Sequence, residues 1–402
     1  MKTSKNHICI VSDQRLANVI PILQLEPEYV TLVVSDDMKP ISEQLKSFLK
    51  IYRKNTTVIE KTGLPTDSIE SIQEFCLNLI TDLKDQLPNT ELIYNVTGGS
   101  KLMAIAFMQF AKDFDDIIYT DTATHHILRI KEMPSSAVDM ISVLDINSYF
   151  KAQGKTVRDI KSDVASQIDI IKKRLKVTNY LAKNAEVLEH FIGEINQKVK
   201  SAVEERNNKI VITQPQQQFN QPVKKQKFEL LQLFKELDII QWDESSPQKF
   251  YLHRTDTIRY LTGEWLEEYA YFCAVNSGAD YIGWSVQFTD DSEPKADIRN
   301  ELDVVVLHNN VVLIIECKTM KFGFNANKDS NTIYQMDSIK KGAGTFAKSV
   351  LLSARPLDHE TKAGKQVAVE ARARSAAIEP LVGSQLKQLT QKIKETLAIK
   401  SS

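Results

Sequence analysis

Apolar and polar positions in the first part of the chain alternate between two periods. Short apolar runs typical of buried strands are followed by longer segments with apolar residues at helical spacing. The expected strands are 7–12, 29–35, 57–60, 91–96, 116–120 and 125–130. The expected helices are 14–25, 41–53, 67–87 and 100–112. This βαβα order predicts an α/β, Rossmann-like domain over residues 1–145, with a parallel sheet covered by helices on both faces.

The pattern changes over residues 146–255, which we interpret as a mainly helical middle region. The expected helices are 157–176, 179–203 and 228–237. The expected polar loops or linkers, the second rich in Gln, are 204–208 and 213–226. The last helix and a hairpin of strands 239–242 and 249–253 resemble a winged-helix element. It could bind DNA, but without a basic recognition helix we favour a connector or dimerisation module.

A second α/β pattern occupies residues 256–402. The expected helices are 256–276 and 334–342. The expected strands are 281–288, 304–307, 311–315 and 349–352. Strands 304–307 and 311–315 form a strongly apolar hairpin joined at His308, Asn309 and Asn310. An Asn pair suits a tight turn because Asn tolerates positive φ.

Charged residues gather at the open end of this hairpin. Asp303 precedes the first strand, and the second runs into Glu316, Cys317 and Lys318. Side chains alternate along a strand, so Glu316 and Lys318 should share a face while Cys317 faces the opposite layer. Crowded carboxylates raise each other's pKa, and Mg²⁺ or Mn²⁺ would remove this conflict. The pattern favours metal-assisted phosphodiester hydrolysis, with surface salt bridges as the alternative.

Further charged residues could assist at this end of the hairpin. The expected helix 256–276 carries Glu264, Glu267 and Glu268, and one of them could complete the metal site. Glu267 and Glu268 are adjacent and cannot both face inward, and each could instead be an exposed helix acid. Candidate contacts to a nucleic-acid backbone are Lys340, Lys341, Arg372 and Arg374. A solvated surface role is an equal alternative for these four side chains.

Two loops follow strands of the N-terminal domain and would lie at the carboxyl edge of its sheet, where ligands of such folds bind. Their residues are Ser12, Asp13 and Gln14, then Thr97, Gly98, Gly99, Ser100 and Lys101. Glycines let backbone N–H groups approach an anion, and the following helix adds its positive end, so a phosphate ligand is expected, with a plain turn as the alternative. Thr122 would lie on the same rim. The loop matches neither a P-loop nor a dinucleotide fingerprint.

Composition narrows the class of protein. A chain of 402 residues is too long for one ordinary core. Its net charge of -1 requires any nucleic-acid surface to be local, and from residue 318 onward Lys and Arg outnumber Asp and Glu. Four cysteines without paired spacing fit a reducing cytoplasm. No apolar run reaches the length of a membrane span, and the first residues contain no apolar core of a signal peptide, so neither a membrane nor a secreted location is expected.

With both halves in view, the chain resembles proteins that join a CRISPR-associated Rossmann-fold (CARF) domain to a PD-(D/E)xK nuclease of the restriction-endonuclease-like fold. The N-terminal residues that carry the resemblance are Ser12 to Gln14 and Asn95 to Lys101. The C-terminal ones are Gly263 to Glu267, Asn300 to Asp303, and Glu316 to Lys318. Where the motif nominally has proline, two residues before Asp303, this chain has Glu301, whose role is left open.

The resemblance implies a function for each half. It implies a homodimer whose CARF domains together bind cyclic oligoadenylate, with cyclic tetra-adenylate as the expected ligand, and this binding would activate cleavage of DNA, RNA or both in type III CRISPR antiviral defence. Mn²⁺ or Mg²⁺ would be held by Asp303, Glu316, Glu267 and the backbone carbonyl of Cys317. Lys318 would be the catalytic lysine. The alternatives are a non-catalytic cyclic-nucleotide sensor or DNA-binding regulator, and a restriction-type endonuclease, which leaves the glycine loop unexplained.

Overall fold

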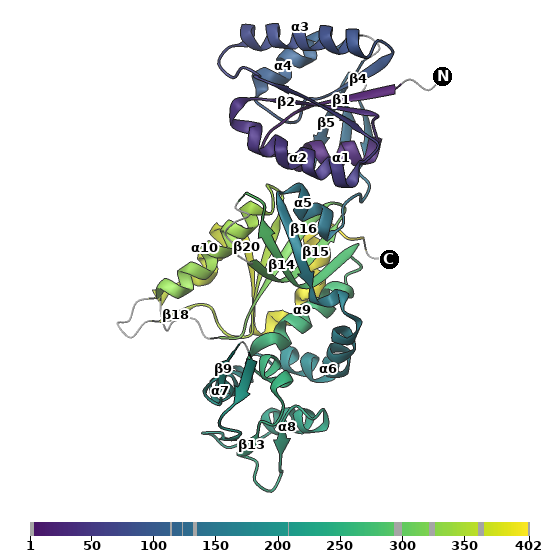
Figure 1. Cartoon of the computed structure of the whole chain (residues 1–402). Coiled ribbons are helices and arrows are strands. Elements are labelled where there is room, and N and C mark those ends of the chain that lie inside the picture. The colour runs from purple at the N-terminus through teal and green to yellow at the C-terminus, as the bar shows by residue number, and fades with distance from the viewer. Residues whose placement is uncertain are drawn as a thin grey trace.

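The structure is a computed structural model that describes residues 4–112, 115–122, 124–131, 135–207, 209–292, 300–320, 326–360 and 366–400. The molecule is elongated (Figure 1). The N-terminal domain lies at one end and the C-terminal sheet in the centre. A smaller module with helices α7 (Glu189–Ser201) and α8 (Gln226–Glu236) lies at the other end.

The N-terminal sheet confirms the Rossmann-like prediction. Its strand order is β3-β2-β1-β4-β5-β6-β7, parallel as far as β5 and antiparallel beyond. These strands are β1 (Ser4–Ile10), β2 (Tyr29–Val34), β3 (Thr57–Thr62), β4 (Thr90–Asn95), β5 (Asp116–Asp121), β6 (His126–Arg129) and β7 (Ser136–Asp139). One face packs on α1 (Arg15–Leu25) and α2 (Lys39–Tyr52), and the other on α3 (Ile69–Gln86) and α4 (Lys101–Phe110).

The C-terminal sheet is mixed, with the order β20-β17-β16-β15-β14-β8. Its strands are β8 (Lys155–Ile160), β14 (Tyr281–Asp290), β15 (Asn300–His308), β16 (Val311–Lys318), β17 (Lys348–Ser353) and β20 (Ile378–Val382). The surrounding elements are α5 (Ile146–Ala152), α9 (Trp265–Val275), α10 (Ala326–Gly342), β18 (His359–Glu360), β19 (Gln366–Val367), α11 (Val369–Ser375) and α12 (Leu389–Thr396). The predicted β15–β16 hairpin is confirmed, with positive φ at both Asn309 and Asn310.

The sequence-based prediction of a helix at 157–176 was wrong. Its first residues belong to β8, which pairs antiparallel with β14 as the edge strand of the C-terminal sheet, and the helix α6 (Ala165–Lys183) begins later. The physical reason is that the strand is stabilised by a partner about 130 residues away in the sequence. Local periodicity contains no information about that pairing.

The rest of the middle region forms the module at the far end of the molecule. Its strands are β9 (Val203–Arg206), β10 (Lys209–Ile212), β11 (Gln216–Gln218), β12 (Gln241–Trp242) and β13 (Lys249–Tyr251). Helix α8 followed by the β12–β13 hairpin matches the expected winged-helix-like order. The single helix predicted at 179–203 was wrong, because a turn separates α6 from α7, and the loop predicted at 204–208 contains most of β9.

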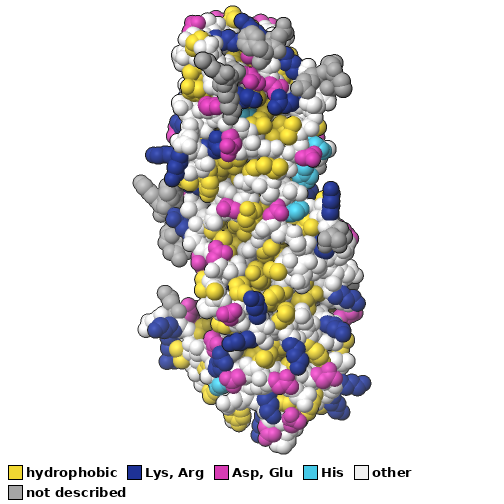
Figure 2. Space-filling view, turned by 90° about the vertical axis from the view of Figure 1, so that its right-hand side faces the viewer, with side chains coloured by type: hydrophobic (Ala, Val, Ile, Leu, Met, Phe, Trp, Pro, Cys, Tyr) yellow, Lys and Arg dark blue, Asp and Glu magenta, His cyan; other side chains and the backbone are white. Residues whose placement is uncertain are grey.

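Apolar cores connect the three parts. One cluster runs from α1 and α2 through α5 to one face of the C-terminal sheet, and another joins the opposite face to α6, α7 and α8. Positive and negative side chains are interspersed among apolar ones on the face seen in Figure 2, in keeping with the near-zero net charge. In the part of the chain that the structure describes, no helix is both long and apolar enough to cross a membrane.

Candidate active site and ligand loops

Asp303 lies in a fork between two strands. The β15–β16 pairing ends at Val304 opposite Ile315, and the strands part beyond this pair. There the Asp303 Oδ2 accepts a hydrogen bond of 2.7 Å from the backbone N–H of Cys317. The N–H and C=O of one strand residue point to the same edge, so the Cys317 carbonyl faces the same fork. The fork therefore holds two oxygen donors that the sequence analysis proposed as metal ligands.

Glu316 and Lys318 lie on the same face of β16, as predicted, and their side chains form an ion pair there. Cys317 points the other way, and its Sγ lies 3.7 Å from the carbonyl of Leu266 on α9. Burial disfavours the charged amine of Lys318, but the carboxylates of Glu316 and Asp303 outweigh this and raise its pKa. The lysine is therefore a fixed cation at the strand end.

Glu267 approaches the fork from α9. Its Oε2 accepts a 3.2 Å hydrogen bond from Trp284 Nε1, and the Lys161 ammonium lies 4.0 Å from the centre of that indole. The neighbouring Glu268 is fully buried and faces α6 instead, where Arg174 pairs with it at 3.1 Å. The two adjacent acids thus point to different neighbours, with Glu267 on the side of the fork, and the alternative of an exposed helix acid was wrong for Glu268.

The continuous helix predicted at 256–276 was wrong, because the chain is kinked at Gly263. This glycine has a φ of 142°, and a Cβ there would lie 2.6 Å from the Thr319 Oγ1. The close approach joins the start of α9 to the end of β16. The kink therefore sets the position of α9, and with it Glu267, relative to the strand end.

Burial and mutual repulsion perturb the acids of the fork. Burial, followed by repulsion from Glu316, raises the pKa of Asp303. Burial and then the nearby Asp303 and Glu264 raise the pKa of Glu267, and the Trp284 hydrogen bond only partly offsets this. A cluster of acids with raised pKa values in one site is typical of a functional centre.

The donor set suits a hard divalent cation, which prefers carboxylate and carbonyl oxygens. No three acidic, His or Cys side chains within the described ranges already converge on one point. Glu316 is turned to Lys318, so binding a metal would require this side chain to rotate, whereas Glu267 can keep the Trp284 hydrogen bond on Oε2 and present its Oε1. The metal ligands therefore remain a prediction.

Glu301 and Glu264, to which the sequence analysis assigned no definite role, each bind a neighbouring side chain. Glu301 Oε1 accepts a 2.5 Å hydrogen bond from Ser285 Oγ, and Glu264 forms an ion pair with Lys161. Both acids contribute to the repulsion acting on Glu267. They therefore add negative charge around the fork while being held by neighbours.

The predicted ligand loops come together at one edge of the N-terminal sheet. Strands β1 and β4 are neighbours, and β5 lies next to β4, so Ser12 to Gln14, Thr97 to Lys101 and Thr122 lie on one rim. A Cβ at Gly98 would lie 2.3 Å from the Ile10 carbonyl, so only glycine allows this approach. Gly99 has positive φ, and Ser100 caps α4. The Ser12 Oγ is buried without a hydrogen-bond partner among the described residues.

Thr97 has a structural role that the sequence analysis missed. Its hydroxyl donates to Asn95 Oδ1 at 2.6 Å and accepts from the backbone N–H of Thr120 at 2.7 Å. Asn95 in turn donates to the Ala17 carbonyl and to Asn18. This buried network fixes the loop from behind. A buried Asn at the end of a strand was the only sequence signal for it.

The four candidate backbone contacts lie on α10 and α11. Lys340 donates to the Ala376 carbonyl at 2.6 Å. Lys341 pairs with Asp337, and Arg374 with Glu370, each one turn away on its own helix. The local pairs of Lys341 and Arg374 favour the solvated-face alternative for these two side chains, whereas Lys340 is hydrogen-bonded to the residue that follows α11.

Comparisons with known proteins agree with this architecture. A family model for the Card1 CARF domain matches residues 6–149, and one for the Card1-like endonuclease domain matches residues 254–399. Can2 from Sulfobacillus thermosulfidooxidans, solved with cyclic tetra-adenylate, has 24% identity and a TM-score of 0.75, with 98% of each chain covered. Protein VC1899 from Vibrio cholerae has 17% identity and a TM-score of 0.79, again with 98% of each chain covered.

A type III CRISPR defence DNA nuclease activated by cyclic oligoadenylate is more distant, with 12% identity, a TM-score of 0.52, and 90% of this chain and 47% of that one covered. These solved structures share the fold. No curated protein matches the chain significantly. The two family models identify both domains, and the chain belongs to the family that joins a Card1-type CARF domain to a Card1-like endonuclease domain.

Proposed function

We propose that this endonuclease cleaves DNA, RNA or both with Mn²⁺ or Mg²⁺, and that cyclic oligoadenylate activates it in type III CRISPR defence. The observation that carries the proposal is the presence, in one chain, of the acid–lysine fork at Asp303 and of a glycine loop at the carboxyl edge of a CARF sheet. The first is suited to hydrolysis, and the second to an anionic ligand.

The fork supports a PD-(D/E)xK-type centre. Asp303, Glu316, Glu267 and the Cys317 carbonyl would hold the metal, which lowers the pKa of bound water and polarises the phosphate. Lys318 lies beside Glu316, where its ammonium would orient the attacking water and stabilise charge on the phosphate. The Trp284 N–H would keep Glu267 from turning away from the fork.

The N-terminal rim supports a cyclic oligoadenylate ligand. The similar Can2 structure contains cyclic tetra-adenylate, and we propose the same ring size here. Backbone N–H groups around Gly98 and Gly99, the Ser12 hydroxyl and Lys101 would contact its phosphates. The ordered Thr97 would support the loop rather than bind the ligand.

A homodimer fits this ligand, because a ring with repeated phosphates suits two symmetry-related loops. Helix α4 begins next to the loop and exposes Leu102, Ile105 and Met108, whose exposed fractions are 45%, 49% and 40%. Their spacing places them on one helix face. We propose that a second copy of the chain covers this stripe.

The contact between the domains offers a route for activation. Asn310, in the β15–β16 turn, accepts hydrogen bonds from the backbone N–H groups of Val143 and Leu144 and donates to the Ile141 carbonyl. The same β15–β16 hairpin ends at the fork. A rearrangement of the CARF domain would therefore act directly on the hairpin that carries the acids.

The test is a cleavage assay with titrated cyclic tetra-adenylate. Replacing both Ser100 and Lys101 with Ala should raise the half-maximal activator concentration at least tenfold, while Lys50→Ala, on the exposed face of α2, serves as the matched control. Lys318→Ala should abolish cleavage and leave activator binding intact. An unchanged dose response in the double variant would refute the sensor assignment, and full activity in Lys318→Ala would refute the active-site assignment.

A further inference from the structure

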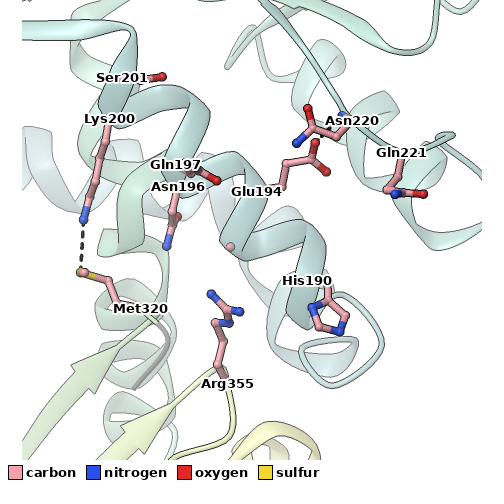
Figure 3. Close-up of a pocket in the computed structure, with 11 residues that line it drawn as sticks. His190, Glu194, Asn196, Gln197, Lys200, Ser201, Asn220, Gln221, Met320 and Arg355 are labelled. Carbon is pink, nitrogen blue, oxygen red and sulfur yellow. Dashed lines mark hydrogen bonds between the residues drawn. The ribbon is translucent and has the colours of Figure 1, made fainter. Parts of the chain in front are cut away.

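A cavity of about 840 Å³ opens between the module at the far end and the C-terminal sheet. Figure 3 shows its wall on α7, with Arg355 and Met320 approaching from the opposite side. The lining residues that matter for the argument are His190, Gly193, Asn196, Lys200, Met320 and Arg355. A volume of this size is typical of sites for small molecules or single nucleotides.

The cavity lies directly beyond the ends of β16 and β17, the first of which carries Glu316 and Lys318. Lys318 on β16 and Ser353 on β17 are register partners in a parallel pair. Met320 and Arg355 each follow two residues later. Two residues advance at most about 7 Å, and the chain bends here, so the cavity begins within about one nucleotide's length of the proposed catalytic lysine.

Arg355 brings incompletely compensated positive charge to this cavity. Its side chain is only 11% exposed, and its ion pair with Glu189 is long, at 3.6 Å. Its Nε is buried without a hydrogen-bond partner among the described residues. A Cβ on Gly193 would lie 2.4 Å from the Arg355 Nη1, so a glycine within α7 makes room for the guanidinium. A planar guanidinium with spare donors is suited to a phosphate.

Apart from Glu194, whose Oε1 accepts a hydrogen bond from the backbone N–H of Asn220, the remaining wall offers mainly neutral hydrogen-bonding groups. Asn196 is 5% exposed, donates to the Thr319 Oγ1 at 3.1 Å, and leaves its Oδ1 without a partner in the described structure. The carboxamides that line the cavity are Asn196, Gln197, Asn220 and Gln221. Met320 adds an apolar surface, and Lys200 lies above it with its ammonium 3.2 Å from the sulfur. Carboxamides recognise base edges, and an apolar side chain packs against a base.

We propose that this cavity binds the nucleotide next to the cleaved phosphodiester, with Arg355 on its phosphate and the carboxamides around its base. The inference rests on the proposed nuclease function. It gives the α7 module a role in holding the substrate strand, in place of the connector role favoured from the sequence. It also explains how a chain with net charge -1 obtains local affinity for nucleic acid.

The test uses full-length protein with Mn²⁺, saturating cyclic tetra-adenylate and a short oligonucleotide cut at one mapped bond. Arg355→Ala should raise KM about tenfold with kcat changed less than twofold, since one charge-assisted contact is lost away from the reacting atoms. Arg355→Lys should recover part of the loss because it keeps the charge. Lys200→Ala, an exposed position that cannot unfold the core, should raise KM about twofold to threefold. Arg206→Ala, on β9 and outside the cavity, is the matched control.

A second measurement addresses the base. An abasic position placed next to the cut should raise KM for the wild-type protein, whereas one placed several nucleotides away should not. Unchanged KM in both Arg355→Ala and Lys200→Ala, with normal wild-type cleavage, would overturn the inference and leave the nuclease function intact. If the wild-type protein cleaves nothing, the proposed function fails, and oligonucleotide binding by fluorescence anisotropy in Ca²⁺ still tests the cavity through the same variants.

Discussion

The charge of Asp303 in the fork should lower the free energy of unfolding at neutral pH, and the Asp303→Asn substitution should restore it. Asn has nearly the same volume and keeps an oxygen that accepts the Cys317 N–H, but it carries no charge. Burial and Glu316 raise the pKa of Asp303 from 3.8 to about 7. At about 1.4 kcal/mol per pKa unit, this shift sets an upper limit of roughly 4 kcal/mol on the destabilisation by the ionised Asp303. Because Asp303 is only partly buried, we expect about half, ~2 kcal/mol.

The sign follows from proton binding. With a raised pKa, the folded state binds more protons than the unfolded chain between about pH 4 and pH 7, so stability falls as the pH rises through this window. Asp303→Asn should therefore raise the unfolding temperature of the C-terminal domain by about 4–8 °C at pH 8 and by clearly less at pH 5. Scanning fluorimetry at both pH values measures this. Mn²⁺ should stabilise the wild type and not the variant. An equal or lower unfolding temperature of the variant at pH 8 would refute the reasoning.

Three further predictions follow from the same site. Trp284→Phe removes the donor to Glu267 and should raise the Mn²⁺ concentration for half-maximal cleavage about tenfold, with activator binding unchanged; an unaltered Mn²⁺ titration contradicts it. Gly263→Ala places a Cβ against Thr319 at a φ of 142°, and should lower the free energy of unfolding of the domain by about 1–3 kcal/mol. Chemical denaturation measures this, and an unchanged free energy of unfolding would disprove the role of the kink. Cleavage at limiting Mn²⁺ should increase with pH through about pH 7, as Asp303 ionises, and a flat pH–rate profile would speak against its role.

Much of the site followed from local sequence, because its geometry depends on short-range features. The Asn309–Asn310 turn folds the hairpin, and strand alternation then places Glu316 and Lys318 on one face. The glycine loop likewise depends on backbone freedom at Gly98 and Gly99, a property visible in the residue type.

What the sequence could not reveal depends on partners distant in the chain. Strand β8 is stabilised by its pairing with β14. Glu268 is buried because it forms an ion pair with Arg174 on α6. Arg355 can approach α7 only because residue 193 is a glycine. The sequence around either residue does not predict that the two are in contact. The kink at Gly263 also could not be predicted from the sequence. Its cause is the close approach of Thr319, which is distant in the chain.

The most direct test of the central claim is the cleavage of mixed DNA and RNA with Mn²⁺, with and without a panel of cyclic oligoadenylates, by the wild type and by Glu316→Ala. We predict that the wild type cuts only when an activator is present, best with cyclic tetra-adenylate, and that Glu316→Ala binds the activator but does not cut. Cleavage that is independent of every activator, or that persists in Glu316→Ala, would contradict the account.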